Sequence, residues 1–218
     1  MAKLSVQQIG ILVITGVMVI GTLGSFAVMI LSDKNQRIEQ ARLQELSDTY
    51  DAATKERQKK VDAQNAELSK RYFATFSKFK NIPAKFAIDS VTKLTTKDLL
   101  VGSGKKIEKN SALSVYYILW NPDGKVLETS IGDGVLNTPL AIEKLGEAAL
   151  IDGWKEGLVG MKIGGVRLIE IPSDKAYGEA GSGDNIGPNT PIKFIVMAID
   201  KVEEIPYPEV PKELLGSY

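Results

Sequence analysis

Residues 149–172 read ALIDGWKEGLVGMKIGGVRLIEIP, and this stretch indicates more about the architecture than any other. Its first half places Leu150, Trp154 and Leu158 four residues apart, so the three side chains stack along one face of a helix. GGVRLIEIP, at residues 164–172, then has the composition of a strand. We therefore expect one short helix that is followed directly by a strand of the same domain.

Further strands are expected on both sides of this helix. SALSVYYILW (residues 111–120) alternates apolar side chains on one face, as a half-buried strand does. NPDG is a turn signal, because proline presets φ and glycine tolerates positive φ, and KVLETS (residues 125–130) follows as the partner strand of a hairpin. TPLAIEKL (residues 138–145) carries helical spacing, and PIKFIVMAIDKVE (residues 191–203) reads as a last strand. The pattern predicts an α+β domain in which an antiparallel sheet holds one short helix.

The composition narrows the chemistry that this chain can perform. The 218 residues carry 27 basic and 27 acidic side chains, so no net charge draws the protein to nucleic acid. Without histidine there is no imidazole base, no Ser-His-Asp triad and no His-ligated zinc. Without cysteine there is no thiol nucleophile, disulfide or thiolate metal site. The function must therefore rest on carboxylates, amines, hydroxyl groups, backbone groups and shape.

The N-terminal part of the sequence predicts a membrane anchor. Residues 9–31 contain no charged side chain. A helix of that length spans roughly 35 Å, enough to cross a bilayer core of about 30 Å. The run is longer than the apolar region of a cleaved secretory signal, which is the alternative. We therefore expect a short flank at residues 1–8 and a transmembrane anchor at residues 9–31.

A long charged helical stalk is expected at residues 32–80, because this stretch contains neither proline nor glycine. Apolar residues such as Leu46, Tyr50 and Val61 recur near a heptad spacing, but Arg57 interrupts them. A solvated stalk is the favoured interpretation, and a homodimerising stalk is the alternative. The aromatic residues near its end predict that this end packs on another part of the protein: Tyr72, Phe73, Phe76 and Phe79.

Composition also sets the remaining boundaries. Residues 81–97 read as a mixed linker, residues 98–204 as the globular domain, and residues 205–218 as a Pro-rich tail. The tail is expected to be a disordered end, with a polyproline II ligand as the alternative. The glycine-rich stretches VGSGKK and GEAGSG lack the spacing of a phosphate loop or a dinucleotide fingerprint. Acidic residues do not cluster at metal-ligand spacing, so we expect neither a cofactor nor a metal.

The order of the motifs resembles the FKBP-type peptidyl-prolyl cis-trans isomerases. Between residues 98 and 203 the chain reads VYYIL, DGKVLETS, LG, LIDGWKEGLVGMKIGG and AYGEAGSGDNIGPNTPIKFIVMAI, in the order of the family pattern. The resemblance implies an FKBP-like fold, a bent antiparallel β-sheet around one short helix with an apolar pocket between them. It also implies an enzyme that rotates X-Pro peptide bonds in that pocket and assists protein folding at the membrane.

The same resemblance implies a role for each pocket residue. Trp154 would form the floor, and the backbone amide of Ile151 would donate a hydrogen bond to the substrate. The Tyr177 hydroxyl would reach a substrate carbonyl, and Glu128 would supply a carboxylate. These four are the implied catalytic residues. The implied substrate-binding residues are Tyr117, Leu127, Leu140, Leu150, Ile186 and Phe194.

A few positions depart from the family pattern. Leu127-Glu128 stands where Phe-Asp is usual, Leu140 where an aromatic residue is common, and Gly187 where the loop usually has proline. We therefore expect a less aromatic and wider pocket. The alternative function is a catalytically weak chaperone or scaffold module that binds Pro-containing segments.

The expected partners follow from these assignments. They are Pro-containing polypeptide clients, the membrane through residues 9–31, macrolide inhibitors, and a second copy through the stalk or the anchor. Lys34, Arg37 and Arg42 outnumber Lys3, which favours a cytoplasmic position for the rest of the chain. A tethered isomerase is most useful on chains that emerge across the membrane, so we expect the domain outside the cytoplasm.

Overall fold

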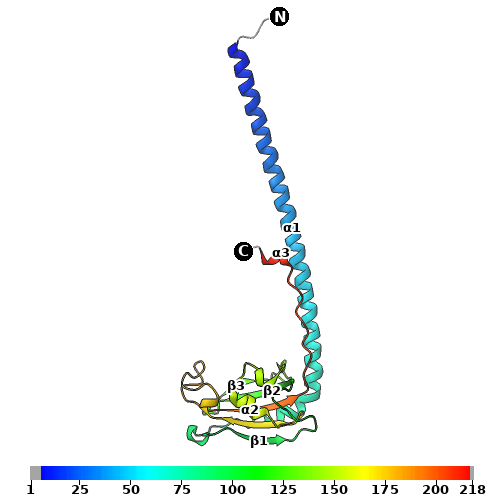
Figure 1. The fold of residues 1–218 in the computed structure, drawn as a ribbon. Helices are drawn as coiled ribbons and strands as arrows, with labels where there is room; N and C mark the ends of the chain where they lie inside the picture. Colours follow the sequence, from blue (N-terminus) through cyan, green and yellow to red (C-terminus); the bar gives the residue numbers. More distant parts are fainter. Residues whose placement is uncertain (1–5, 217–218) are drawn as a thin grey trace. The chain divides into compact units, whose positions relative to one another are not determined.

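The computed structural model describes residues 6–216, and between residues 6 and 31 it describes the side chains of Ser25 and Met29 alone. The chain divides into two compact units, one of Gln58–Pro206 and one of Met1–Arg57 with Tyr207–Tyr218 (Figure 1). The helices are α1 (Val6–Phe76), η1 (Ser77–Phe79), η2 (Ile88–Ser90), η3 (Leu145–Glu147), α2 (Asp152–Leu158), η4 (Ser173–Lys175) and α3 (Lys212–Leu215). The strands are β1 (Thr95–Leu100), β2 (Leu113–Trp120), β3 (Val126–Thr129), β4 (Leu140–Ile142), β5 (Val166–Ile171) and β6 (Ile192–Ile199).

Helix α1 confirms the predicted long helix from residue 32 onward. No proline or glycine interrupts this part, and the helix ends at Phe76 in the 3-10 turn η1. Residues 32–42 are exposed along their whole length, and Arg37 pairs with Asp33 at 3.0 Å one turn away. This part of α1 is therefore a solvated, charged helix.

The prediction of a membrane anchor at residues 9–31, and with it of a single-pass membrane protein, is wrong. Across the residues that the structure describes, no helix is both long enough and apolar enough to span a bilayer. Most side chains of residues 9–31 lie outside the described part. The side chains of residues 32–42 are exposed and mostly polar or charged, which a hydrocarbon core does not accept. The extracytoplasmic position of the domain depended on the anchor and is withdrawn with it.

The six-stranded sheet is antiparallel, and its strand order is β1-β5-β6-β2-β3, with β4 paired to β2. Figure 1 shows the strands gathered around α2. The helix that the spacing predicts at residues 138–145 is wrong, because Leu140–Ile142 forms β4 and pairs with the start of β2. So short an apolar stretch forms no stable helix alone, and pairing with β2 overrides its local spacing.

Two glycines allow α2 to approach β5 closely. A Cβ atom on Gly153 would lie 2.3 Å from Cγ2 of Ile171. A Cβ atom on Gly157 would lie 2.7 Å from Cγ2 of Ile169. The GWKEG motif thus places the helix backbone against the strand, with Trp154 between the two glycines.

A buried arginine also ties α2 to the sheet. Arg167 of β5 donates to the carbonyl oxygens of Gly157 and Val159 at 2.8 and 3.1 Å. Its guanidinium also pairs with both carboxylate oxygens of Asp98 in β1, at 2.6 and 3.2 Å. The end of α2 is therefore fixed to two strands at once.

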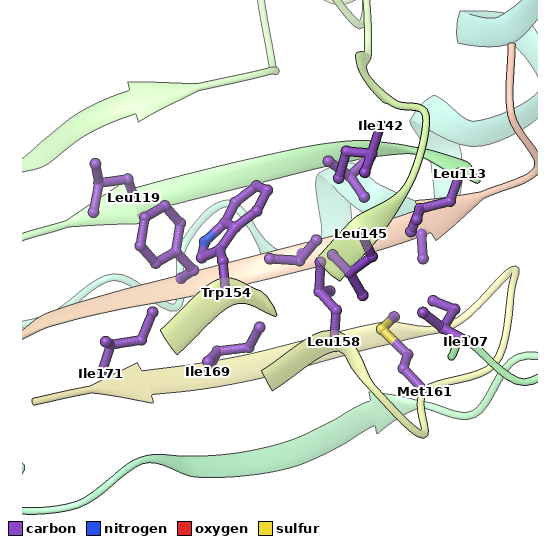
Figure 2. Packing of buried hydrophobic residues seen from close by; sticks show 14 of the residues in the cluster. Ile107, Leu113, Leu119, Ile142, Leu145, Trp154, Leu158, Met161, Ile169 and Ile171 are labelled. Atoms are coloured by element: carbon purple, nitrogen blue, oxygen red, sulfur yellow. The ribbon is translucent and has the colours of Figure 1, made fainter. Parts of the chain in front are cut away.

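The first hydrophobic core fills the space between α2 and the sheet (Figure 2). It draws on β2, β4, α2, β5 and β6 of the unit Gln58–Pro206. The members labelled in Figure 2 are Ile107, Leu113, Leu119, Ile142, Leu145, Trp154, Leu158, Met161, Ile169 and Ile171.

A second core joins the last turns of α1 to the sheet. Phe76 is fully buried and packs with Tyr116 of β2, their ring centroids 6.2 Å apart. Tyr72 contacts the same Tyr116 ring from 6.3 Å. The aromatic residues at the end of α1 thus pack on the sheet, which confirms that this end has a packing partner. The α1 residues of this core are Leu68, Tyr72, Phe73 and Phe76, with Phe79 of η1 beside them.

The C-terminal residues differ from the disordered end that was expected. In the unit that contains Tyr207–Tyr218, Figure 1 shows the segment before α3 beside α1. The Arg57 guanidinium lies 3.5 Å from the centre of the Tyr207 ring, and Arg42 pairs with Glu213 at 3.0 Å. These two contacts hold the described part of the tail on α1.

Candidate active site

A cavity of about 220 Å³ opens between the sheet and α2. Strands β2, β3, β4 and β6 contribute side chains to it, together with α2 and the segments that precede α2 and follow β5. Ten residues line it: Tyr117, Leu119, Glu128, Leu140, Ala149, Leu150, Ile151, Trp154, Tyr177 and Phe194.

Three aromatic rings form the apolar part of the cavity. Trp154 lies edge-on to Tyr117, with centroids 5.3 Å apart, and edge-on to Phe194, with centroids 5.1 Å apart. Such edge-to-face contacts are favourable and hold the rings in fixed orientations. Trp154 is 3% exposed, and Figure 2 shows it projecting from α2. The indole therefore forms a rigid base.

A tyrosine and a carboxylate form the polar side of the cavity. The Tyr117 hydroxyl donates to Oε2 of Glu128 over 2.7 Å, from β2 to β3. Burial, that hydrogen bond and the nearby negative charge raise the pKa of Tyr117 to about 12. Burial, followed by the charge of Glu128, also raises the pKa of Tyr177. Both phenols are therefore neutral near neutral pH and can act as hydrogen-bond donors.

Among the residues that the structure describes, two N–H groups at the cavity have no acceptor. The Nε1 of Trp154 is buried and finds no hydrogen-bond partner among the described residues. The backbone N–H of Ile151 precedes α2, whose first turn donates back to the Ile151 carbonyl. Within the described part of the chain, no acceptor is found for this N–H either. Trp154 Nε1 is a buried donor without a partner, which carries an energetic penalty, so it would gain from a ligand carbonyl. The N–H of Ile151, a half-buried residue, is available to a second carbonyl.

Eight of the ten residues that the sequence nominates line this cavity. The four implied catalytic residues, Tyr177, Glu128, Ile151 and Trp154, are among them. So are the implied substrate-binding residues Tyr117, Leu140, Leu150 and Phe194.

Two nominated residues lie in the core beside the cavity instead. Ile186 is 5% exposed and belongs to the first core, and Leu127 is partly buried against the same core. The carbonyl of Ile186 accepts a hydrogen bond from Ser182 at 2.7 Å. Gly181 is required there, because its φ is +66° and a Cβ atom would lie 2.3 Å from the Ile186 oxygen. This packing fixes the middle of the glycine-rich loop.

Leu119 and Ala149 line the cavity although the sequence does not nominate them. Leu119 pairs directly with Glu128 in the sheet register, so the two side chains share one face. The alternation of apolar residues in β2 was the signal that could have identified Leu119, because Tyr117 lies two residues earlier. Ala149 has no comparable signal.

Acidic side chains do not gather into a metal site here. Among the described residues, no three carboxylates come close enough together to hold an ion.

Comparison with known proteins gives one consistent family. The model of the FKBP-type peptidyl-prolyl cis-trans isomerases matches residues 103–199. The FK506-binding protein of Neisseria meningitidis serogroup A is 38% identical over 103 residues, which cover 47% of this chain and 91% of that protein. FK506-binding protein 4 of Dictyostelium discoideum is 34% identical over 117 residues, but these cover only 30% of its length and 54% of this chain.

One solved structure is also similar in sequence. A peptidyl-prolyl cis-trans isomerase from Pseudomonas syringae pv. tomato is 27% identical, and the match covers 71% of this chain and 96% of that chain with a TM-score of 0.43.

Proposed function

Because this chain belongs to the family of FKBP-type peptidyl-prolyl cis-trans isomerases, we propose that its 220 Å³ cavity binds and rotates X-Pro bonds of polypeptides. The reaction fits the residue types. Resonance gives the amide a rotational barrier of about 18–20 kcal/mol, and no bond is made or broken when it is crossed. Neither a nucleophile nor a metal is needed, so the lack of histidine and cysteine is no obstacle.

The apolar rings would lower the barrier by differential binding. In the twisted transition state the amide has lost its conjugation, so it is less polar than the planar amide. A cavity formed by Trp154, Tyr117 and Phe194 excludes water and offers a rigid surface to a proline ring. We assign Trp154 as the floor, and Leu140 and Leu150 as walls.

The unpaired donors would hold the substrate around the rotating bond. The N–H of Ile151 is available for one substrate carbonyl, and the neutral Tyr177 hydroxyl is available for another. Glu128 is already engaged by Tyr117, so we assign it to orient the Tyr117 ring. The observation that carries this proposal is the pairing of an unsatisfied Ile151 N–H with a buried Trp154 in one cavity.

The biological substrates would be folding polypeptides. Uncatalysed X-Pro isomerisation takes tens to hundreds of seconds, which is slow enough to limit folding. Two relatives are named for binding FK506, so we also propose that this macrolide occupies the cavity. Self-association through residues 32–80 stays a prediction that sedimentation of the full chain would measure.

The test is a proline-peptide isomerisation assay on the full chain with and without FK506. We expect acceleration over buffer, inhibition by FK506, and a loss of about tenfold in kcat/KM for Tyr177→Phe if its hydroxyl holds a substrate carbonyl. A folded chain that binds Pro-containing peptides without accelerating their isomerisation would instead be the chaperone or scaffold module. A folded chain that neither accelerates nor binds would contradict both functions.

A further inference from the structure

We infer that the end of helix α1 positions one wall of the active-site cavity, with Ser69 as the main positioning residue. The wall is formed by Leu140, which directly follows a loop between β3 and β4. We call this loop, residues 131–139, the wall loop. This inference rests on the proposed function, because it concerns the substrate preference of the same cavity. The residues involved all belong to the compact unit Gln58–Pro206.

Two hydrogen bonds join α1 to the wall loop. Ser69 is 6% exposed, and its hydroxyl oxygen accepts a hydrogen bond from the backbone N–H of Leu136 at 2.9 Å. One helical turn earlier, Asn65 Nδ2 donates to Oγ1 of Thr138 at 2.7 Å. Residues four apart share a helix face, so both bonds point to the same loop. Leu136 is 2% exposed and packs in the second core with Phe76.

Both ends of the wall loop are connected to residues that line the cavity. Leu140 follows Thr138 by two residues, opens β4 and lines the cavity. At the other end, Asn137 donates to the carbonyl of Ser130 at 2.9 Å. The Ser130 N–H donates to the carbonyl of Tyr117 at 2.8 Å, and the Ser130 hydroxyl accepts from the Tyr117 N–H at 2.9 Å. The loop therefore leads directly into Leu140 and is bonded, through Ser130, to the backbone of Tyr117.

Apart from these bonds, the wall loop is held by contacts of its own. Ile131 bridges to Leu136, and the Gly132 N–H donates to the carbonyl of Val135 at 2.9 Å, while residues 133–135 at the tip are exposed. Leu136 is the loop's most buried large apolar side chain, and Ser69 satisfies its backbone N–H. Without that hydroxyl, the buried N–H has no acceptor unless the loop shifts. A shift of the loop moves Leu140, and this alters the space available to a residue next to proline.

The test compares Ser69→Ala with Lys70→Ala in the full chain. Lys70 is the adjacent residue, but its side chain is 73% exposed and pairs only with Glu67 among the described residues. Each variant is assayed with a Leu-Pro and an Ala-Pro peptide at a temperature where circular dichroism shows it fully folded. We expect Ser69→Ala to lower kcat/KM for the Leu-Pro peptide by about tenfold and for the Ala-Pro peptide much less. Lys70→Ala should leave both values and their ratio unchanged.

A second measurement reports directly on the position of Leu140 in the cavity wall. The methyl resonances of Leu140 are recorded by NMR without any substrate, so they report on positioning whether or not the protein is active. We expect them to move in Ser69→Ala and to stay in place in Lys70→Ala. Unchanged Leu140 resonances in Ser69→Ala would overturn the inference, and so would an unchanged substrate ratio in an active protein. A wild type that fails to accelerate isomerisation would contradict the proposed function alone.

Discussion

Tyr117 shows how burial, together with a hydrogen bond to Glu128, raises the pKa of a phenol in the cavity. The Tyr117 phenol donates to the Glu128 carboxylate at 2.7 Å, and burial with this contact raises its pKa from 10.0 to about 12. A phenol whose pKa is higher in the folded protein stabilises the fold fully below the unfolded pKa. That contribution is lost as the pH rises through the folded pKa, so the window here runs from pH 10.0 to about 12.

Replacing Tyr117 by Phe should therefore have a pH-dependent effect on stability. Near neutral pH we expect the variant to be less stable by about 1 kcal/mol, because it lacks the hydrogen bond to Glu128. Urea denaturation should show a constant difference from the wild type below pH 10.0 and a shrinking one between pH 10.0 and about 12. The pKa of Tyr116 is also raised to about 12, but Tyr116 is present in both proteins, so its contribution cancels in the difference between their stabilities. A difference that stays constant up to pH 12 would contradict this assignment.

Gly153 has no side chain, and this lets α2, which carries Trp154, lie close to β5. A Cβ atom at this position would lie 2.3 Å from Ile171 Cγ2, closer than the two atoms can approach. We expect Gly153→Ala to lower the free energy of unfolding by about 1–3 kcal/mol, because α2 must move away from β5. Isomerase activity should fall as well, since α2 carries Trp154.

Gly187→Ala is the matched control for that substitution. A Cβ atom on Gly187 would meet only Oγ1 of Thr190, at an ordinary 3.6 Å. This variant should keep wild-type stability and activity, as measured by urea denaturation and by the peptide assay. Equal stability of the two alanine variants would show that close approach of α2 to β5 is not required.

At the scale of elements, two contacts join the C-terminal tail to α1. Tyr207 stacks on Arg57, and Glu213 pairs with Arg42. Both α1 residues lie in a part of the helix that is otherwise widely exposed to solvent. We expect removal of residues 207–218 to increase amide hydrogen exchange in α1 between Arg42 and Arg57, because a solvated helix frays without tertiary contacts.

The full chain with Val210→Ser is the control for the tail deletion. Val210 is 43% exposed and lies between the two contacts, so its replacement leaves them intact. Exchange in α1 should then match the wild type. If the deletion leaves exchange between Arg42 and Arg57 unchanged, the tail does not stabilise the helix.

Local sequence patterns predicted some elements and missed others for physical reasons. The two-residue period of residues 111–120 predicted β2 and the face that carries Tyr117. The strand is not half-buried as expected, because the second core with Phe76 of α1 covers its other face. The spacing around Trp154 predicted α2. In contrast, β4 was predicted as a helix, because its pairing with β2 depends on residues almost thirty positions away. Leu119 was missed although it lies two residues after Tyr117, and so on the same face of β2.

At the scale of the whole molecule, the isomerase unit includes the end of α1. The compact unit begins at Gln58, and the second core needs Phe76 and its neighbours. The aromatic cluster in the sequence predicted that this end packs on something. It did not predict the sheet as the partner, because packing on a strand leaves no periodic signal in the helix beyond the apolar stripe itself.

A chain that starts at residue 81 should therefore be unstable. It loses Phe76, whose full burial against Tyr116 alone is worth about 3 kcal/mol or more. It also exposes the apolar face of β2 and β6 that α1 covers. Thermal unfolding should show a much lower midpoint than for a chain that starts at Gln58. Equal midpoints would show that α1 is not an integral part of the isomerase unit.

The most direct test of the central claim is the rate of cis-trans exchange of an X-Pro peptide, measured by NMR with the full chain and its Trp154→Leu variant. We expect the wild type to accelerate exchange well above buffer. We expect Trp154→Leu, while still folded, to lose at least about tenfold of kcat/KM because the floor of the cavity is no longer a rigid ring. Exchange no faster than in buffer, or a folded Trp154→Leu variant as active as the wild type, would contradict it.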